Sequence, residues 1–306
     1  MGIRRHVITL TAALAVLSAS APALAQEKLK VLGTFSILGD FVKNVGGDRV
    51  EVTTLVGPNS DAHVYSPAPA DAKRVAAARV IITNGLGFEG WMARLLRASG
   101  SKASPAVATK GIKPRKQAAH GHSHGQGPDH DTDPHAWQSV ANAKIYVANI
   151  RDALIAADPG GKATYEANAT AYLGKLDTLD KEVRDAVAKI PQERRRIITS
   201  HDAFGYFQAA YGIEFIAPQG VSTESEASAR DVGRIITQIK RQKIPAVFLE
   251  NVTDPRLIQR IAAESGARVG GQLYSDALTD EKGAAPTYID MMRYNIKQLV
   301  SALATS

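Results

Sequence analysis

The sequence contains no cysteine in its 306 residues. Disulfide bonds are therefore excluded, and the stability of the chain has to come from its own hydrophobic core. About 280 residues remain once the signal peptide described below is removed, which is long enough to bury such a core. The absence of cysteine also leaves no residue at the cleavage site to carry a lipid, so we expect no lipid anchor.

Long hydrophobic runs are also missing. After residue 25 no segment approaches the roughly 18 unbroken apolar residues of a membrane-spanning helix. The first 25 residues combine a basic start (MGIRR), an apolar run (VITLTAALAVLS) and the small residues Ala23 and Ala25, which is typical of a secretory signal peptide cleaved after Ala25. We expect a periplasmic protein of a Gram-negative bacterium, because an exported chain without an anchor stays near the cell only behind an outer barrier. Secretion into the medium is the alternative.

Negative charge is in mild deficit, with 37 Lys and Arg against 30 Asp and Glu. Arg4 and Arg5 leave with the signal peptide, so the mature balance is 35 minus 30, or +5. The basic runs at 194–196 and 240–241 have no aromatic residues between the charges, which indicates a solvated face and not a nucleic-acid site. We therefore expect no nucleic-acid partner. We also expect a monomer.

Short β-branched runs alternate with helical patterns along the chain, which predicts an α/β fold with mostly parallel strands. The predicted strands fall into two groups, and we expect one α/β lobe over residues 26–161 and a second over 191–306. The strands of the two groups are 28–35, 50–56 and 79–85, and then 195–201, 213–219, 246–251 and 269–275.

A long helix is predicted over residues 162–190, between the two lobes. Its apolar residues recur at steps of three, four and seven, and Pro159 and Pro191 mark its two ends. At 1.5 Å per residue it would be about 43 Å long, which suits a rigid spine linking the lobes. An ordinary crossover helix inside one domain is the alternative. A further helix, 287–304, is predicted to pack on the second sheet.

Histidine is concentrated in one segment. His6 leaves with the signal peptide, and four of the seven remaining histidines lie among Gly, Ser, Gln and Asp, with almost no apolar residue to fix a fold. We predict a mobile loop at about 116–132 whose histidines form weak accessory metal sites. They are His120, His122, His124 and His130.

The other three histidines are His63, His135 and His201. Each lies at the edge of ordered sequence beside an aromatic residue that could shape a pocket, namely Tyr65, Trp137 and Phe204 respectively. His201 also comes where a strand should end, the position at which α/β sheets bind ligands. Each alone would be an ordinary structural histidine, but three imidazoles and one carboxylate together suit a tetrahedral zinc site. From the residues alone the carboxylate stays open between Asp276, which follows a predicted strand, and three glutamates: Glu224, Glu226 and Glu250.

A family resemblance rests on stretches that cover nearly the whole mature chain in one order: DAHVYSPAPAD, NGLGFEGW, DPHAW, TSHDAFGYF, VSTESEASARD, FLENVTDPRLIQRIAAESGA and GGQLYSDALT. The sequence resembles the zinc-type solute-binding proteins of bacterial metal ABC transporters (cluster A-I, ZnuA-like, AztC-type branch). The resemblance implies two α/β lobes joined by one long backbone helix, with one metal ion in the cleft between them. By motif, the first lobe supplies His63 and His135 as metal ligands, and the second supplies His201 and Asp276.

Two neighbourhoods depart from the family pattern. Ser66 and Ala68 stand where relatives often have Glu and Thr, and the segment 138–140 (Gln-Ser-Val) stands where they have Leu-Asp-Pro. Relatives that resemble manganese binders place a carboxylate at the position of His201. A histidine there favours Zn²⁺, because Mn²⁺ prefers oxygen ligands.

The resemblance implies a protein that captures Zn²⁺ and delivers it to an inner-membrane ABC permease, with a periplasmic zinc chaperone as a second candidate partner. A manganese-type protein of the same fold is the alternative. A zinc hydrolase is a second alternative, with one of the three glutamates as its base, but the sequence has no HExxH or nucleophile motif. A fourth protein ligand at Asp276 would close the coordination shell, so we expect no enzymatic activity and no catalytic residues.

Overall fold

The computed structural model describes residues 27–116 and 132–304. The predicted signal peptide and the four loop histidines (His120, His122, His124 and His130) lie outside the described residues. Among the helices of the described ranges, none combines the length and the apolar content needed to cross a membrane.

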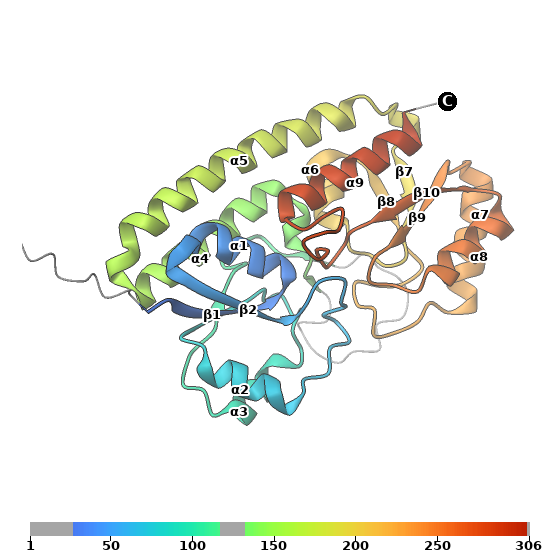
Figure 1. Cartoon of the computed structure of the whole chain (residues 1–306). Coiled ribbons are helices and arrows are strands. Elements are labelled where there is room, and N and C mark those ends of the chain that lie inside the picture. Colours follow the sequence, from blue (N-terminus) through green and yellow to red (C-terminus); the bar gives the residue numbers. More distant parts are fainter. Residues whose placement is uncertain (1–26, 117–131, 305–306) are drawn as a thin grey trace, which may run out of the picture.

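The first sheet is parallel throughout and has the strand order β2-β1-β3-β4. Its strands are β1 (Leu29–Phe35), β2 (Val50–Val56), β3 (Val80–Thr83) and β4 (Ala106–Val107). Figure 1 shows the helices α1 (Ser36–Gly46) and α4 (Val140–Ala157) on one side of this sheet, with α2 (Pro69–Ala77) and α3 (Met92–Ser99) on the other. The predicted parallel α/β arrangement of the first lobe is therefore confirmed.

The second sheet is also parallel, in the order β10-β9-β7-β8. Its strands are β7 (Arg196–Ile198), β8 (Glu214–Ile216), β9 (Ala246–Glu250) and β10 (Arg268–Leu273). Helices α7 (Ala229–Gln242) and α8 (Pro255–Ser265) bury an aliphatic cluster against β7 and β9. Helix α6 (Gly205–Tyr211) follows β7, and α9 (Tyr288–Leu303) packs on β10 as predicted.

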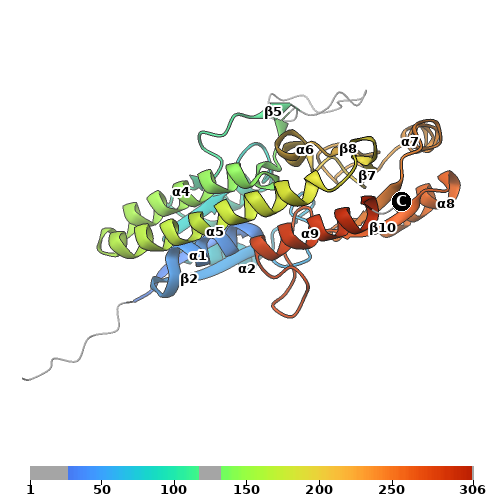
Figure 2. The ribbon, with the colours of Figure 1, turned by 90° about the horizontal axis from the view of Figure 1, so that it is seen from above.

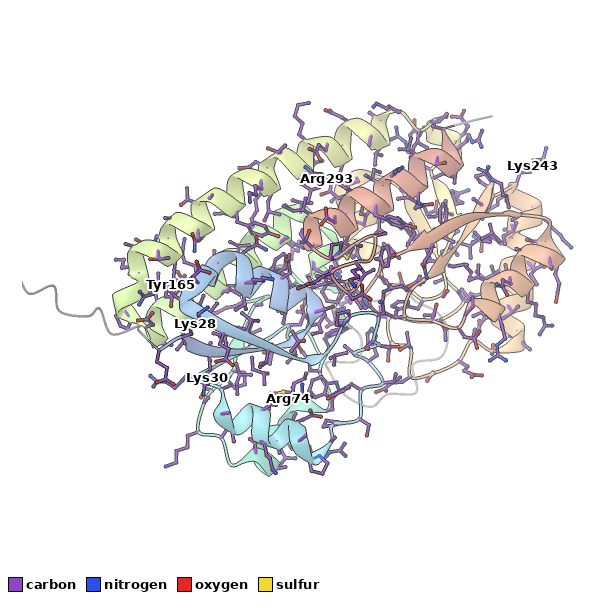
Figure 3. The ribbon with its side chains drawn as sticks, viewed as in Figure 1. Lys28, Lys30, Arg74, Tyr165, Lys243 and Arg293 are labelled. Atoms are coloured by element: carbon purple, nitrogen blue, oxygen red, sulfur yellow. The ribbon has the colours of Figure 1, made fainter. Side chains whose placement is uncertain are left out.

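Helix α5 (Lys162–Ala188) runs along both lobes (Figures 1 and 2). Its 27 residues correspond to about 40 Å. One side packs on α1 and α4 of the first lobe, and its second half packs on α9. In Figure 3 Arg293 of α9 reaches towards α5, where its Nε donates to Glu182 Oε2 at 2.8 Å. One continuous core cluster includes buried residues of both lobes and of α5, so the helix acts as the predicted spine.

Four short 3₁₀ turns complete the helical structure of the described residues: η1 (Gly47–Arg49), η2 (Ala136–Gln138), η3 (Pro159–Gly161) and η4 (Gln192–Arg194). A small antiparallel ladder, which the sequence did not predict, pairs β5 (Arg115–Lys116) with β6 (Thr132–Asp133). Lys116 and Thr132, assigned by sequence to the mobile loop, are opposite one another in this ladder. The exact limits of the two lobes stay predictions.

Candidate metal centre

The candidate site lies where strands of both sheets end. His63 is in the loop between β2 and α2, and His135 follows β6 and precedes η2. His201 follows β7, and Asp276 follows β10. The carboxyl ends of parallel strands share one edge of a sheet, and for this reason residues far apart in the sequence meet there.

The structure brings the four predicted side chains together, with one donor atom of each inside a set that spans no more than 4.8 Å. His63 Nε2 lies 3.2 Å from His135 Nε2 and 3.3 Å from Asp276 Oδ2. Asp276 Oδ2 is 3.2 Å from His201 Nε2, and Oδ1 is 3.5 Å from His135 Nε2. Ligands at about 2.0–2.1 Å from a tetrahedral Zn²⁺ are separated by about 3.3–3.4 Å, so these spacings fit such an ion.

The surroundings of Asp276 give the strongest indication of what the site binds. It is completely buried, and neither of its carboxylate oxygens has a hydrogen-bond partner among the described residues. A buried carboxylate without hydrogen bonds is costly unless a cation compensates its charge. Both oxygens instead face imidazole nitrogens, so the residues present suit a bound divalent cation.

Of the four residues, His63 lies nearest the surface. This residue is 7% exposed, whereas His135, His201 and Asp276 have no exposed surface. The adjacent Val64 is the most exposed large hydrophobic residue of the described chain, at 53%. The main chain before His63 is held in place by the Trp91 indole, which donates to Ala62 O at 2.9 Å.

Two of the three histidines have a carboxylate behind them. The Nδ1 of His135 donates to Asp133 Oδ1 at 2.9 Å, which fixes the tautomer and leaves Nε2 free to face the site. His201 Nδ1 lies 2.7 Å from Glu250 Oε2, an ion-pair contact, and Glu250 Oε1 accepts the main-chain N–H groups of Ser200 and His201. Both carboxylates are buried.

The carboxylate that the residue pattern left open is thereby placed. Asp276 faces the three imidazoles, while Glu250 stands behind His201 instead of facing the centre. Glu224 and Glu226 are exposed and lie outside the cluster. The role of Asp133 was not predicted from the sequence, although its position two residues before His135 in the DPH motif was an available signal.

Neighbouring charges raise the pKa of His135 and His201 and lower the pKa of Asp276. Burial alone would lower the pKa of His135, but the charge of Asp276 and the hydrogen bond to Asp133 outweigh it and raise this pKa to about 9. Burial would likewise lower the pKa of His201, but the charges of Glu250 and Asp276 raise it well above its usual value. Burial would raise the pKa of Asp276, yet the two cationic imidazoles hold it well below its usual range.

His63 behaves differently. Burial lowers its pKa and outweighs Asp276, which would raise it, and positive charge on His135 and His201 adds to the lowering. These shifts favour protons on His135 and His201 beside Asp276, and a neutral imidazole at His63. A divalent cation would have to displace these protons.

Aromatic rings form one wall of the site. The ring centroid of Phe88 is 4.8 Å from that of His63, and Trp137 is 5.2 Å from His135. Phe88 belongs to the NGLGFEG loop after β3 and was not among the aromatic residues expected there. Tyr65, which was expected, turns its hydroxyl to Asp71 instead.

Hydrogen bonds join the two lobes beside the site. The side chains of Trp137 and Gln138 both donate to Ser275 O, at 2.9 and 2.7 Å, next to Asp276. Gln138 is one of the residues that departs from the family pattern, and here it has a defined role. Asp61 accepts the His63 N–H at 2.8 Å and the Thr223 hydroxyl of the second lobe at 2.6 Å.

Comparison with known proteins agrees with this arrangement. The family described as "ZnuA: Zinc-uptake complex component A periplasmic" matches residues 31–302. The manganese-binding lipoprotein MntA of Halalkalibacterium halodurans is 35% identical over 282 residues, covering 91% of this chain and 89% of that protein. The iron-binding protein YfeA of Yersinia pestis is 35% identical over 283 residues, covering 92% and 88%. Since MntA is named a lipoprotein, the predicted absence of a lipid anchor is not borne out.

A solved structure has the same architecture. The periplasmic zinc-binding protein TroA of Treponema pallidum superposes with a TM-score of 0.83 at 32% identity, covering 91% of this chain and all of that one. Two lobes with parallel sheets, a long linking helix and a metal-binding cleft are thus common to both proteins. The relatives are named for three different metals, so their names do not decide which metal this chain takes.

Proposed function

This chain belongs to the ZnuA family of metal-binding solute-binding proteins of ABC transport, and from that premise we propose that it captures Zn²⁺ in the periplasm and delivers it to an inner-membrane ABC permease. A member of this family is a transport component and not an enzyme. His63, His135, His201 and Asp276 are the proposed ligands, and the ion is the cargo.

The observation that supports zinc is the donor set. Three imidazole nitrogens and a carboxylate that has no hydrogen bond within the described parts of the chain point at one another in a buried site. Zinc, a borderline-soft ion, is well satisfied by three nitrogens and one oxygen, whereas Mn²⁺ favours oxygen donors. The four donors leave no open position for a reacting water on a tetrahedral ion, which also suits a carrier.

The test is a competition titration with a chromophoric chelator, using Zn²⁺ and Mn²⁺ separately. We expect one tight site that prefers Zn²⁺, and more than about a 100-fold loss of zinc affinity on replacing any one of the three histidines by Ala, because loss of a ligand exceeds the 10- to 100-fold cost of disturbing an outer partner. Thr170→Ala, a replacement on the exposed face of α5, is the control. Unchanged zinc affinity in the histidine variants would overturn the ligand assignment.

A manganese-type function is the second candidate, and one feature of this chain favours it. Both oxygens of Asp276 face the centre, which permits a bidentate carboxylate and a fifth coordination position. Competition between Zn²⁺ and Mn²⁺ for the wild-type protein at matched free-ion concentrations discriminates between the two candidates, because a preference for Mn²⁺ would favour the second. In a zinc carrier, the variant His201→Glu should lower zinc affinity and raise the relative affinity for Mn²⁺.

Partners are proposed from the same premise. The ABC permease is the receiving partner, and a periplasmic zinc chaperone that loads the site is a second proposed partner. Co-purification of the permease with the metal-loaded protein, compared with the Asp276→Asn variant, checks the first of these.

A further inference from the structure

Arg115 lies behind the metal centre, one residue beyond the ligands and their hydrogen-bond partners. Its Nε is 4.0 Å from Asp133 Oδ2, while Oδ1 of the same carboxylate accepts the Nδ1 proton of His135 at 2.9 Å. The chain of contacts therefore runs from a guanidinium through a buried carboxylate to a proposed ligand. Arg115 and Asp133 are also paired opposite each other in the β5–β6 ladder.

The guanidinium is held in this place by its surroundings. Its charged carbon lies 5.7 Å from the centre of the Tyr206 ring, and the Tyr206 hydroxyl accepts the Arg115 main-chain N–H at 3.0 Å. Next to Tyr206, Gly205 leaves the room that the pair needs. A Cβ atom there would lie 2.5 Å from Asp133 Oδ2 and 3.3 Å from Arg115 Nε.

The Nε of Arg115 is buried and has no hydrogen bond among the described residues, although the whole side chain is 37% exposed. It borders a cavity of about 280 Å³ that Asp133 and Gly205 also line. This cavity reaches Asp133, which separates it from His135. A charge on its wall can therefore act on the ligand without touching the metal.

We propose that Arg115 is a positioning residue that acts through Asp133 to limit how tightly the centre holds its divalent cation. The guanidinium competes with the His135 N–H for the negative charge of Asp133. With less negative charge behind it, the imidazole is a weaker donor, and carboxylate partners of ligating histidines normally raise ligand basicity. The inference rests on the proposed function, because it takes His135 as a ligand.

Such a restraint suits a protein that carries a cargo. A solute-binding protein must release its ion to the next component, so the residence time of the ion matters as much as its capture. Arg115 acts on the site through Asp133 and leaves the four donor atoms unchanged.

The experiment measures zinc affinity by chelator competition, and zinc dissociation by stopped flow, in Arg115→Gln, Arg115→Met and Arg115→Lys. We expect the two neutral variants to bind zinc about three- to tenfold more tightly, mainly through slower dissociation, because the positive charge beside Asp133 is removed. The gain is no larger because solvent screens this partly exposed charge in the wild-type protein. Arg115→Lys keeps the positive charge, so its zinc affinity and dissociation rate should match those of the wild-type protein. Arg196→Gln is the matched control, because Arg196 pairs with Glu214 on the wall of the same cavity.

A double-mutant cycle with Asp133→Asn tests the route of the effect. If the charge acts through Asp133, the gain from Arg115→Gln should fall below about twofold in the Asn background. Unchanged or weaker binding in both neutral variants, or an equal gain in the two backgrounds, overturns the inference. His135→Ala separates the two levels: if that variant keeps wild-type zinc affinity, the ligand assignment itself is wrong.

Discussion

The three histidines of the site differ in whether a carboxylate contacts the imidazole on the side away from the centre. His135 has Asp133 and His201 has Glu250, whereas His63 has no carboxylate on its far side among the described residues. The pKa of each of these two imidazoles is raised, whereas burial lowers the pKa of His63. His63 is also the most exposed of the four.

A pH dependence follows from the raised pKa of His135. Since that pKa is about 9, cation binding at neutral pH must release its proton, so zinc affinity should keep increasing as the pH rises from 7 to 8.5. With only unperturbed histidines the affinity would level off above about pH 7. Calorimetry in buffers of different ionisation enthalpy measures the protons released; a count of zero at pH 7 contradicts the prediction.

The same shift affects the stability of the metal-free protein with the opposite sign. The folded-state pKa of His135 lies above its unfolded value, so its contribution to stability is full below about pH 6.5 and is lost as the pH rises through about 9. Raising the pH therefore strengthens metal binding while it weakens this contribution to the empty fold.

Gly205 gives a prediction about close packing. Gly205→Ala should push Asp133 away from its position and lower zinc affinity about tenfold, because the new Cβ would lie 2.5 Å from Asp133 Oδ2. Gly233→Ala is the control, since a Cβ at Gly233 on α7 meets nothing within 4 Å. Chelator competition on both variants makes the comparison. Equal affinities would show that Asp133 can shift without cost.

Among the elements, α5 has the largest structural role. Its buried stripe recurs at helical spacing, and its contacts extend from α1 and α4 to α9, so a single helix stabilises both lobes. Hydrogen bonds of the second lobe to Asp40 and Ser36 on α1 reinforce the same side of the molecule. The lobes are therefore joined along the spine and bonded again beside the metal centre.

Leu176, fully buried in α5, tests this role. Leu176→Ala should lower the free energy of unfolding by about 2–5 kcal/mol, the usual cost of a large cavity in a core. The urea transition should remain single, because one core cluster connects the lobes. The exposed neighbour Lys175→Ala should change stability by less than about 0.5 kcal/mol. Two separate transitions in the Leu176 variant would mean that the lobes unfold independently.

At the scale of the whole molecule, the β5–β6 ladder pairs the residues that flank the histidine-rich segment in the sequence. The ladder places the chain on either side of residues 117–131 next to Asp133, and Asp133 contacts His135. The four donors of the centre all come from the described residues. The loop histidines are thus not needed to complete the proposed coordination shell, and their role as weak accessory sites stays a prediction.

Deletion of residues 120–130 tests this division. We expect the shortened protein to keep one tight zinc site of unchanged affinity and to lose only weak binding or fast loading. Equilibrium titration and stopped-flow loading of both proteins provide the comparison, with replacement of the four loop histidines by Gln as the control for chain length. Loss of the tight site would mean that the loop supplies a ligand.

The sequence by itself determined the elements and the ligand types. Strand and helix periodicity are local properties, so the α5 stripe and the strands before His201 and Asp276 could be recognised from short windows of sequence. The family resemblance singled out Asp276, which the residue pattern had left open with Glu250. Only the tertiary structure decided that Asp276 faces the imidazoles while Glu250 and Asp133 stand behind them, and that Phe88 forms the wall. These relations join residues far apart in the chain, and they depend on how the two sheets are packed against one spine, which no local pattern records.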